Sequence, residues 1–420
     1  MIQRTEYLNK LIAFRDKQLI KIVTGIRRCG KSTLLELYQQ WLLQNGVEAE
    51  QILAINFEDL DYEELTDSKK LYAYLKAHLA DGKMTYIFLD EIQNVPDFPK
   101  AVDSLYLKKN VDLYLTGSNA YLLSSEIATR IAGRYVQIEM LPLSFREYME
   151  STGSMEDRGV KYAEYLENSS FPYALELKGQ PAELRDYLEG IFNTILIKDV
   201  MSRRKITDPL MLKSILRFLF DSIGSPLSSK KIADTMTSAG RKIDPKTVER
   251  YLDALTESYI IYPARRYNIR GRQYLKTMEK YYVVDIGLRY LLLGSQKADS
   301  GHILENVIYL ELLRRGYEVF VGKMDEFEID FVAQNAKGLT YFQVALSVRD
   351  EKTLERELRP LMAIRDHYPK LLLTMDDDPE TQYDGIRRIN ARDWLLGLTE
   401  PSFSAAPQNA PKNAEPQQSR

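Results

Sequence analysis

Residues 25–32 read GIRRCGKS, and this stretch decides the fold that we expect for the N-terminal region. It matches the pattern G-x-x-x-x-G-K-[ST], with glycine at 25 and 30 followed by Lys31 and Ser32. The apolar run before it, QLIKIVTG (18–25), predicts a strand, and KSTLLELYQQWLLQ (31–44) predicts a helix. This context is the one that a phosphate-binding loop (P-loop) requires. The alternative is a chance glycine-rich turn after a strand.

The loop offers the groups that Mg²⁺ and ATP need. Glycines let backbone N–H groups point inward, and the following helix adds the positive end of its dipole. We expect Lys31 to bridge the β- and γ-phosphates, Ser32 to ligate Mg²⁺, and Thr33 to lie behind it. Cys29 is interpreted as a small filler, with an oxidisable thiol as the alternative. The predicted ATP-binding residues are Gly25, Ile26, Arg27, Arg28, Cys29, Gly30, Lys31, Ser32 and Thr33.

A second apolar run, YIFLDE (86–91), ends in two acids. Carboxyl ends of parallel strands meet at one edge of a sheet, so this pair is expected to face the P-loop. Asp90 would reach Mg²⁺, and Glu91 would polarise the attacking water. The alternative is a strand end with solvated acids. The acids that follow the predicted strand 52–57, Glu58 and Asp59, are interpreted as a solvated turn, with an outer shell of the site as the alternative.

Further candidates follow the next strand, DLYLTGSN. Asn119 could contact the γ-phosphate or the attacking water, and a plain Gly-Ser-Asn turn is the equally weighted alternative. Arg130 and Arg134 lie in ATRIAGRY, and either could stabilise the transition state in cis or in trans, with Arg134 favoured. The alternative is a surface arginine paired to Glu126 or Glu139. The predicted catalytic residues are Glu91, Lys31, Asn119 and Arg134, and the predicted metal ligands are Ser32 and Asp90.

The wider pattern predicts an α/β fold. Strands expected at 18–25, 52–57, 85–90 and 111–116 alternate with helices near 65–80 and 98–109, which indicates a parallel sheet covered on both faces. A helical stretch at about 182–203 closes this region. Three helices and a strand pair between 210 and about 280 follow the order of a winged helix-turn-helix, and residues 300–400 form another α/β pattern. We divide the chain into 1–203, 204–295, 296–400 and a disordered tail, 401–420.

Composition narrows the class of protein. The 420 residues carry a formal net charge of −3, one cysteine and three histidines. A single cysteine permits no intramolecular disulfide, which predicts a reducing compartment. The N-terminus lacks the apolar core of a signal peptide, and no apolar run reaches the roughly 20 residues that span a bilayer. We therefore expect a cytoplasmic protein that does not contact a membrane.

The segments GIRRCGKSTLL, INFED, YIFLDEIQNV and LPLSFREY resemble the prokaryotic AAA-type ATPases of the AAA+ superfamily. More narrowly, they resemble a subgroup in which this domain precedes a C-terminal domain of unknown function. The resemblance implies an AAA+-like P-loop NTPase sheet, a winged helix and a small restriction-endonuclease-like domain. Nucleases of that fold use a helix Glu, a hairpin Asp and Glu-x-Lys. Here Glu305 and Asp330 match, but Gln343 and Ala345 replace Glu-x-Lys, so nuclease activity is not expected.

The predicted winged helix carries a basic surface with interleaved tyrosines, which is typical of DNA contact. A solvated basic face, or a winged helix that packs on the ATPase core, is the alternative. The leading interpretation is an ATPase whose cycle moves the C-terminal domains, with DNA and other copies of the chain as candidate partners. Its rival is an ATP-bound scaffold with negligible turnover, and an active nuclease is a third alternative. The basic residues are Arg241, Lys242, Lys246, Arg250, Arg265, Arg266, Arg270, Arg272 and Lys276.

Overall fold

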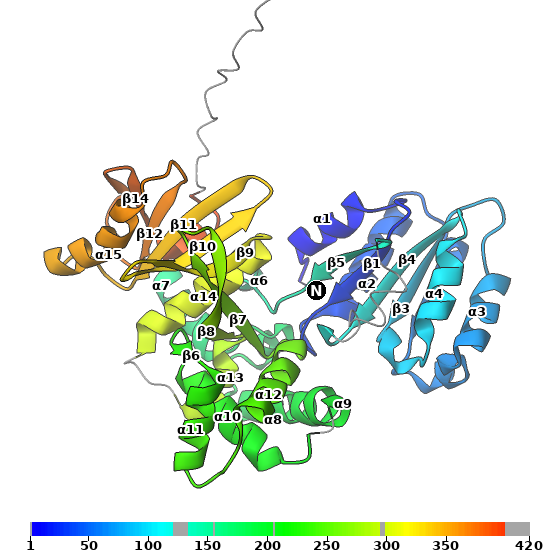
Figure 1. Ribbon diagram of the computed structural model, residues 1–420. Helices are drawn as coiled ribbons and strands as arrows, with labels where there is room; N and C mark the ends of the chain where they lie inside the picture. The colour runs from blue at the N-terminus through cyan, green and yellow to red at the C-terminus, as the bar shows by residue number, and fades with distance from the viewer. Residues whose placement is uncertain (1, 121–132, 154–155, 205, 295–298, 400–420) are drawn as a thin grey trace, which may run out of the picture.

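The N-terminal part of the chain is a parallel sheet flanked by helices (Figure 1). The structure, a computed structural model, describes residues 2–120, 133–153, 156–204, 206–294 and 299–399. Five strands are ordered β2-β3-β4-β1-β5, and all neighbours run parallel. The elements are α1 (Thr5–Ala13), β1 (Ile20–Thr24), α2 (Lys31–Gln44), β2 (Ile52–Asn56), α3 (Ser68–Ala77), β3 (Thr85–Asp90), α4 (Phe98–Tyr106), β4 (Val111–Gly117) and β5 (Tyr135–Glu139).

Alternating residues of the central strands form two separate cores. Phe88 and Tyr114 pack with α1 and α2 on one face, while Ile87 and Leu113 pack with α3 and α4 on the other. Because successive strand residues point to opposite faces, a strand buried on both sides reads as one continuous apolar run. The predicted P-loop sheet is therefore confirmed. The predicted strand 85–90 has the observed bounds, and the other predicted elements of the sheet differ by a few residues at their ends.

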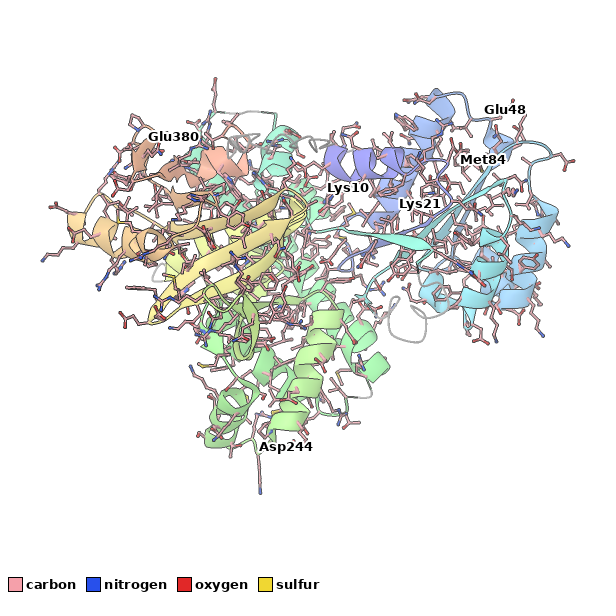
Figure 2. All side chains as sticks on the ribbon, turned by 45° about the horizontal axis from the view of Figure 1, so that its top comes forward. Lys10, Lys21, Glu48, Met84, Asp244 and Glu380 are labelled. Atoms are coloured by element: carbon pink, nitrogen blue, oxygen red, sulfur yellow. The ribbon has the colours of Figure 1, made fainter. Side chains whose placement is uncertain are left out.

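The rest of the chain begins with helices and a hairpin. These elements are α6 (Phe145–Ser151), α7 (Arg158–Glu167), α8 (Pro181–Thr194), a π-helical segment (Ile195–Met201), α9 (Ser202–Arg204), α10 (Pro209–Asp221), β6 (Pro226–Leu227), α11 (Ser229–Ser238), α12 (Pro245–Glu257), β7 (Ile261–Asn268), β8 (Gln273–Val283) and α13 (Ile286–Leu293). The predicted helix at 182–203 is thus observed as a run of α8, the π-helical segment and α9. Figure 2 shows Asp244, just before α12, at the far tip of this helical part.

A nine-stranded sheet follows and joins two regions that the sequence analysis separated. Its order is β13-β14-β12-β11-β10-β9-β7-β8-β6, and β7 pairs parallel with β9 through Arg266 and Val321. The predicted wing is thus built into this sheet, and a boundary at 295–296 cuts through it. The later elements are α14 (Ser300–Arg314), β9 (Glu318–Met324), β10 (Phe327–Asn335), β11 (Gly338–Ala345), α15 (Glu351–Ala363), β12 (Lys370–Thr374), β13 (Thr381–Tyr383), β14 (Ile386–Asn390) and α16 (Ala391–Leu395).

The helices before residue 204 also pack with the later part of the chain. Both α7 and α8 contact α13, so packing does not follow a boundary at 203 either. The four-part division stays a prediction, and its predicted tail lies outside the described residues. Within the described ranges, no helix has the length and apolar character needed to cross a membrane.

Candidate functional site

The P-loop leaves β1 in a conformation that depends on glycine. Gly25 has φ +148°, and a Cβ on it would lie 2.1 Å from the carbonyl oxygen of Met140, so a side chain there would collide with backbone. The Met140 N–H in turn donates to Thr24 O at 2.7 Å and fixes β5 beside the start of the loop. Gly30, at φ +102°, directly precedes the first residue of α2. The N–H groups in the first turn of α2 have no partner within the helix, so they can bind an anion.

Lys31 folds back over the loop and faces the acid pair. Its Nζ donates to Gly25 O at 3.1 Å and to Ile26 O at 3.3 Å, and it lies 3.7 Å from Glu91 Oε1. The lysine is only 4% exposed. This brings two predicted site residues, 60 positions apart in the chain, into one buried cluster at the carboxyl edge of the sheet.

A hydroxyl on the neighbouring strand aligns both acids. Thr116, on β4, donates to Asp90 Oδ1, and its Oγ1 accepts the Glu91 N–H at 2.9 Å. Burial raises the pKa of Asp90, against hydrogen bonds from the hydroxyls of Ser32 and Thr116 that lower it. The predicted metal ligands Ser32 and Asp90 are therefore neighbours. Thr116 was missed by the sequence reasoning, although a hydroxyl at the end of LYLTG was a usable signal.

The residues that follow β4 add polar groups at the same carboxyl edge of the sheet. Asn119 is 2% exposed, and no described residue donates to its Oδ1. Ser118 lies within hydrogen-bond distance of Gln93 Nε2, at 3.5 Å, and Gln93 also donates to Glu91 Oε2. A buried amide oxygen without a protein donor is suited to accept a hydrogen bond from water. The position of Asn119 therefore fits the predicted contact with the attacking water better than it fits a solvated turn.

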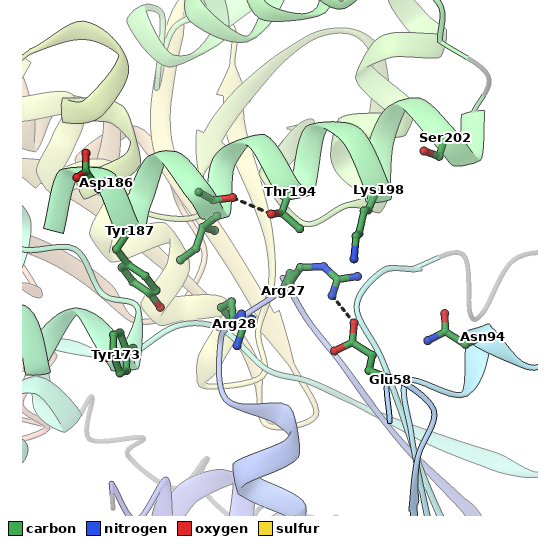
Figure 3. A pocket seen from close by; sticks show the side chains of 12 residues that line it. Arg27, Arg28, Glu58, Asn94, Tyr173, Asp186, Tyr187, Thr194, Lys198 and Ser202 are labelled. Atoms are coloured by element: carbon green, nitrogen blue, oxygen red, sulfur yellow. Dashed lines mark hydrogen bonds and ion pairs between the residues drawn. The ribbon is translucent and has the colours of Figure 1, made fainter. Parts of the chain in front are cut away.

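Arg27 connects the loop to two acids. Its guanidinium lies 2.8 Å from Glu58 Oε1 (Figure 3). It also lies 3.1 Å from Asp199 Oδ2. Glu58 is thus part of an outer shell, the alternative to the solvated turn. Asp199 comes from the π-helical segment more than 170 residues later and was missed, because no local pattern marks it. Cys29 is fully buried, and burial raises the pKa of its thiol, which fits the filler interpretation.

Two hollows meet at the loop. A cavity of about 820 Å³ is lined by Lys31, Ser32, Thr33 and Glu91, and it extends to the segment 172–176. A second, of about 1070 Å³, lies between the loop and α8 (Figure 3). Both include Arg27, Arg28 and Tyr173. Each is large enough for a ligand of nucleotide size.

Arg134 lies at the edge of the sheet opposite the P-loop. Its carbonyl oxygen accepts the Ile20 N–H, which places it where β1 begins, whereas the P-loop follows the end of β1. A five-residue strand separates those points by about 15 Å. The Arg134 side chain pairs with Asp103 and lies over the Tyr106 ring. This position does not favour a role in cis for Arg134, and its catalytic role, in cis or in trans, stays a prediction. Arg130 lies outside the described residues.

The residues present fit Mg²⁺ and ATP. A loop that only glycine can form, a buried lysine, and a hydroxyl beside a carboxylate form the donor set that a magnesium triphosphate requires. Asn119 Oδ1, which accepts from no residue in the described part of the chain, marks where a water can be held. Ser32 and Asp90 would hold the metal, as expected from the sequence, with phosphate oxygens and water completing its shell.

The nuclease-like residues meet in a buried cluster that includes an internal lysine. Lys280 Nζ, from β8, lies 2.9 Å from Glu305 Oε1 and 3.0 Å from Glu328 Oε1. Burial and the charge of Glu305 raise the pKa of Asp330 to about 8. Gln343, at the position of the missing Glu, has its Oε1 3.4 Å from the Asp330 N–H. The cluster brings Glu305 and Asp330 together, and both the nuclease-like fold and the absence of nuclease activity stay predictions.

Part of the expected basic surface is neutralised. Arg270 pairs with Asp325 at 2.9 Å, and Arg265 lies 3.7 Å from Glu279. Lys246 and Arg250 on α12 are exposed. The candidate DNA-contacting surface therefore keeps these cations of α12, and contact with DNA stays a prediction.

Comparison with known proteins agrees with the N-terminal fold. A family described as "AAA domain" matches residues 17–149, and a domain of unknown function (DUF8612) matches residues 159–299. The solved Walker-type ATPase PABY2304 of Pyrococcus abyssi is 16% identical, with a TM-score of 0.48, over 70% of this chain and 96% of that one. AMPPCP-bound DnaA from Aquifex aeolicus is 15% identical, with a TM-score of 0.29, over 60% of this chain and 86% of that one.

The family model identifies the region of residues 17–149 as an AAA domain. An uncharacterized protein of Haemophilus influenzae is 40% identical over 400 residues, which is 94% of this chain and 99% of the relative. The uncharacterized protein MJ1544 of Methanocaldococcus jannaschii is 30% identical over 332 residues, or 74% of this chain and 71% of the relative. The chain belongs to the family of these two proteins, with an AAA domain followed by a domain of unknown function.

Proposed function

We propose that the protein binds ATP with Mg²⁺ and hydrolyses it, and that the cycle changes how the C-terminal part is held. The observation that carries this proposal is the cluster of the buried Lys31, Asp90 and Glu91 with the half-buried Ser32 at the carboxyl edge of the sheet. These residues belong to two separate segments, and the fold brings them together where parallel sheets bind ligands. A static ATP scaffold would need the loop but has no need for Glu91.

The residues of the site divide the work of hydrolysis. Backbone N–H groups of the loop and Lys31 bind the triphosphate, and Ser32 and Asp90 would hold Mg²⁺, which would supply further charge neutralisation. Glu91, oriented by Thr116 and Gln93, accepts the proton of a water as its oxygen bonds to the γ-phosphorus. The bond from the γ-phosphorus to the bridging oxygen breaks, and ADP leaves with the electron pair. Asn119 positions that water.

Phosphate release by purified protein tests the proposal, measured with ATP and Mg²⁺ at several protein concentrations, with and without duplex DNA. Lys31→Ala should abolish nucleotide binding, whereas Glu91→Gln should retain ATP and stop turnover. Normal hydrolysis by Glu91→Gln would refute the assignment of the base. Tight ATP binding without any turnover in the wild type would favour the scaffold.

Turnover at several protein concentrations and the salt dependence of DNA binding test the two candidate partners. We propose that Arg134 or Arg130 acts in trans, so turnover per chain should rise with protein concentration. We also propose that exposed cations of α12 contact DNA phosphates, with Lys246→Ala lowering the salt dependence of binding by about one unit of slope. A turnover rate that is independent of concentration would refute the first of these proposals, and unchanged salt dependence would refute the second.

A further inference from the structure

The P-loop arginine Arg27 is held by carboxylates from two directions. Its Nε and Nη2 lie 3.1 and 3.4 Å from the two oxygens of Asp199, and its Nη1 lies 2.8 Å from Glu58 Oε1. Asp199 is 4% exposed, whereas the Glu58 side chain is 48% exposed. The fork of a guanidinium matches carboxylate and phosphate equally well, so a phosphate group can replace a carboxylate on it.

The guanidinium also lies at the reacting end of the site. Burial lowers the pKa of Arg27, but the charges of Asp199, Glu58 and Glu91 together raise it above its usual value, so Arg27 stays charged. Lys31 is 3.7 Å from the same Glu91. Two cations, Arg27 and Lys31, thus line the cavity that also holds Glu91.

Asp199 also contacts the segment that follows β4. Its Oδ1 is 3.4 Å from Ser118 Oγ, one residue before Asn119. The π-helical segment that carries Asp199 follows α8, which lines the larger hollow opposite Arg27 (Figure 3). Single turns of π-helix occur frequently at functional sites. A buried carboxylate and an incoming γ-phosphate would both bind the same arginine, and their negative charges would repel each other.

We propose that Arg27 binds the γ-phosphate of ATP within its own subunit, and that Asp199 holds this arginine until ATP replaces it. The proposal rests on the proposed ATPase function and assigns to Arg27 a role in cis, which the position of Arg134 does not favour for that residue. Because Asp199 belongs to the segment that leads into the C-terminal part, the exchange of partners on Arg27 transmits the presence of the γ-phosphate to that part. ADP lacks this phosphate and leaves the Arg27–Asp199 pair intact.

The test compares affinity for a non-hydrolysable ATP analogue with affinity for ADP, together with ATP turnover. Arg27→Ala should lower the ratio of analogue to ADP affinity about tenfold and turnover about 100-fold, with ADP affinity retained. Arg27→Lys, which keeps the charge without the fork, should recover part of both. Asp199→Asn should raise analogue affinity roughly tenfold because the competing charge is removed. Arg204→Ala is the matched control. Arg204 lies on the same helical run as Asp199, but it pairs with Glu257 instead, with its Nε 2.7 Å from Glu257 Oε2.

A second measurement needs no variant that could misfold. Amide hydrogen exchange of residues 195–204 in the wild type should be faster with the analogue than with ADP. Equal exchange with both nucleotides, or an unchanged affinity ratio in Arg27→Ala, would overturn the proposal while leaving ATP hydrolysis in place. A wild type that neither binds nor hydrolyses ATP would instead refute the proposed function itself.

Discussion

Replacing Gly25 with alanine perturbs the P-loop without touching any charged group. The new Cβ would meet Met140 O at 2.1 Å, closer than Cβ contacts in proteins come, and the conformation at φ +148° is strained for any side chain. Relief requires β5 and the loop to separate, which breaks the hydrogen bond from the Met140 N–H to Thr24 O. Gly46 provides a matched control, because its φ is +86° but a Cβ there meets nothing within 4 Å.

The loss in the free energy of unfolding can be estimated as a sum of separate contributions. The left-handed conformation costs roughly 1–2 kcal/mol in both variants. The collision in Gly25→Ala adds about 1–3 kcal/mol of overpacking and about 1 kcal/mol for the lost hydrogen bond. The two variants should therefore differ by about 2–4 kcal/mol in the free energy of unfolding. At about 2–4 °C per kcal/mol, Gly25→Ala should melt roughly 4–16 °C below Gly46→Ala.

Thermal unfolding followed by circular dichroism gives the two melting temperatures, and titration with a fluorescent ATP analogue gives the affinities. Gly25→Ala should also lose analogue affinity, because the loop amides move away from the phosphates, whereas Gly46→Ala should bind as the wild type does. Equal melting temperatures and equal affinities for the two variants would show that the loop tolerates a side chain at position 25. The account of the loop given above would then be wrong.

Three further outcomes are expected. Burial raises the pKa of Asp330 in the folded protein to about 8, so its carboxyl destabilises the fold increasingly as pH rises from about 4 to 8. The melting temperature of Asp330→Asn should therefore rise relative to that of the wild type across this range. A difference in melting temperature that does not change with pH would contradict this. Cys29, fully buried with a raised pKa, should resist alkylation until denaturant is added; mass spectrometry showing rapid native labelling would contradict its burial. Arg134→Ala should leave turnover unchanged in dilute protein, and a loss of single-subunit turnover would restore a role in cis.

The N-terminal fold could be predicted because its signals are local. In YIFLDE (86–91), an apolar run is followed directly by two acids, so one short segment predicts both a buried strand and the reactive groups at its end. The glycine pattern of the loop is equally local, since the constraint at Gly25 lies in its own backbone. The meeting of Lys31 with Glu91 then followed from the parallel order of strands.

The rest depends on distant contacts that no short pattern encodes. The hairpin of β7 and β8 was predicted as a wing because its sequence is strand-like and basic, but pairing with β9 is decided some fifty residues later. Asp199 lies in an ordinary helical sequence and gains its place only when α8 packs beside the loop. Arg134 follows the site residues closely in the sequence, which made it a candidate. In the fold, however, it precedes β5 and lies at the edge of the sheet where β1 begins, opposite the edge where the P-loop lies.

The pairing of β7 with β9 has a consequence for synthesis of the chain. Every strand of the N-terminal sheet is available once residue 139 has left the ribosome, so that sheet can close while translation continues. The hairpin of β7 and β8 must wait with one edge open until residues 318–324 emerge, and open edges recruit foreign strands. A polypeptide that stops near residue 299 keeps that edge uncovered for its whole lifetime.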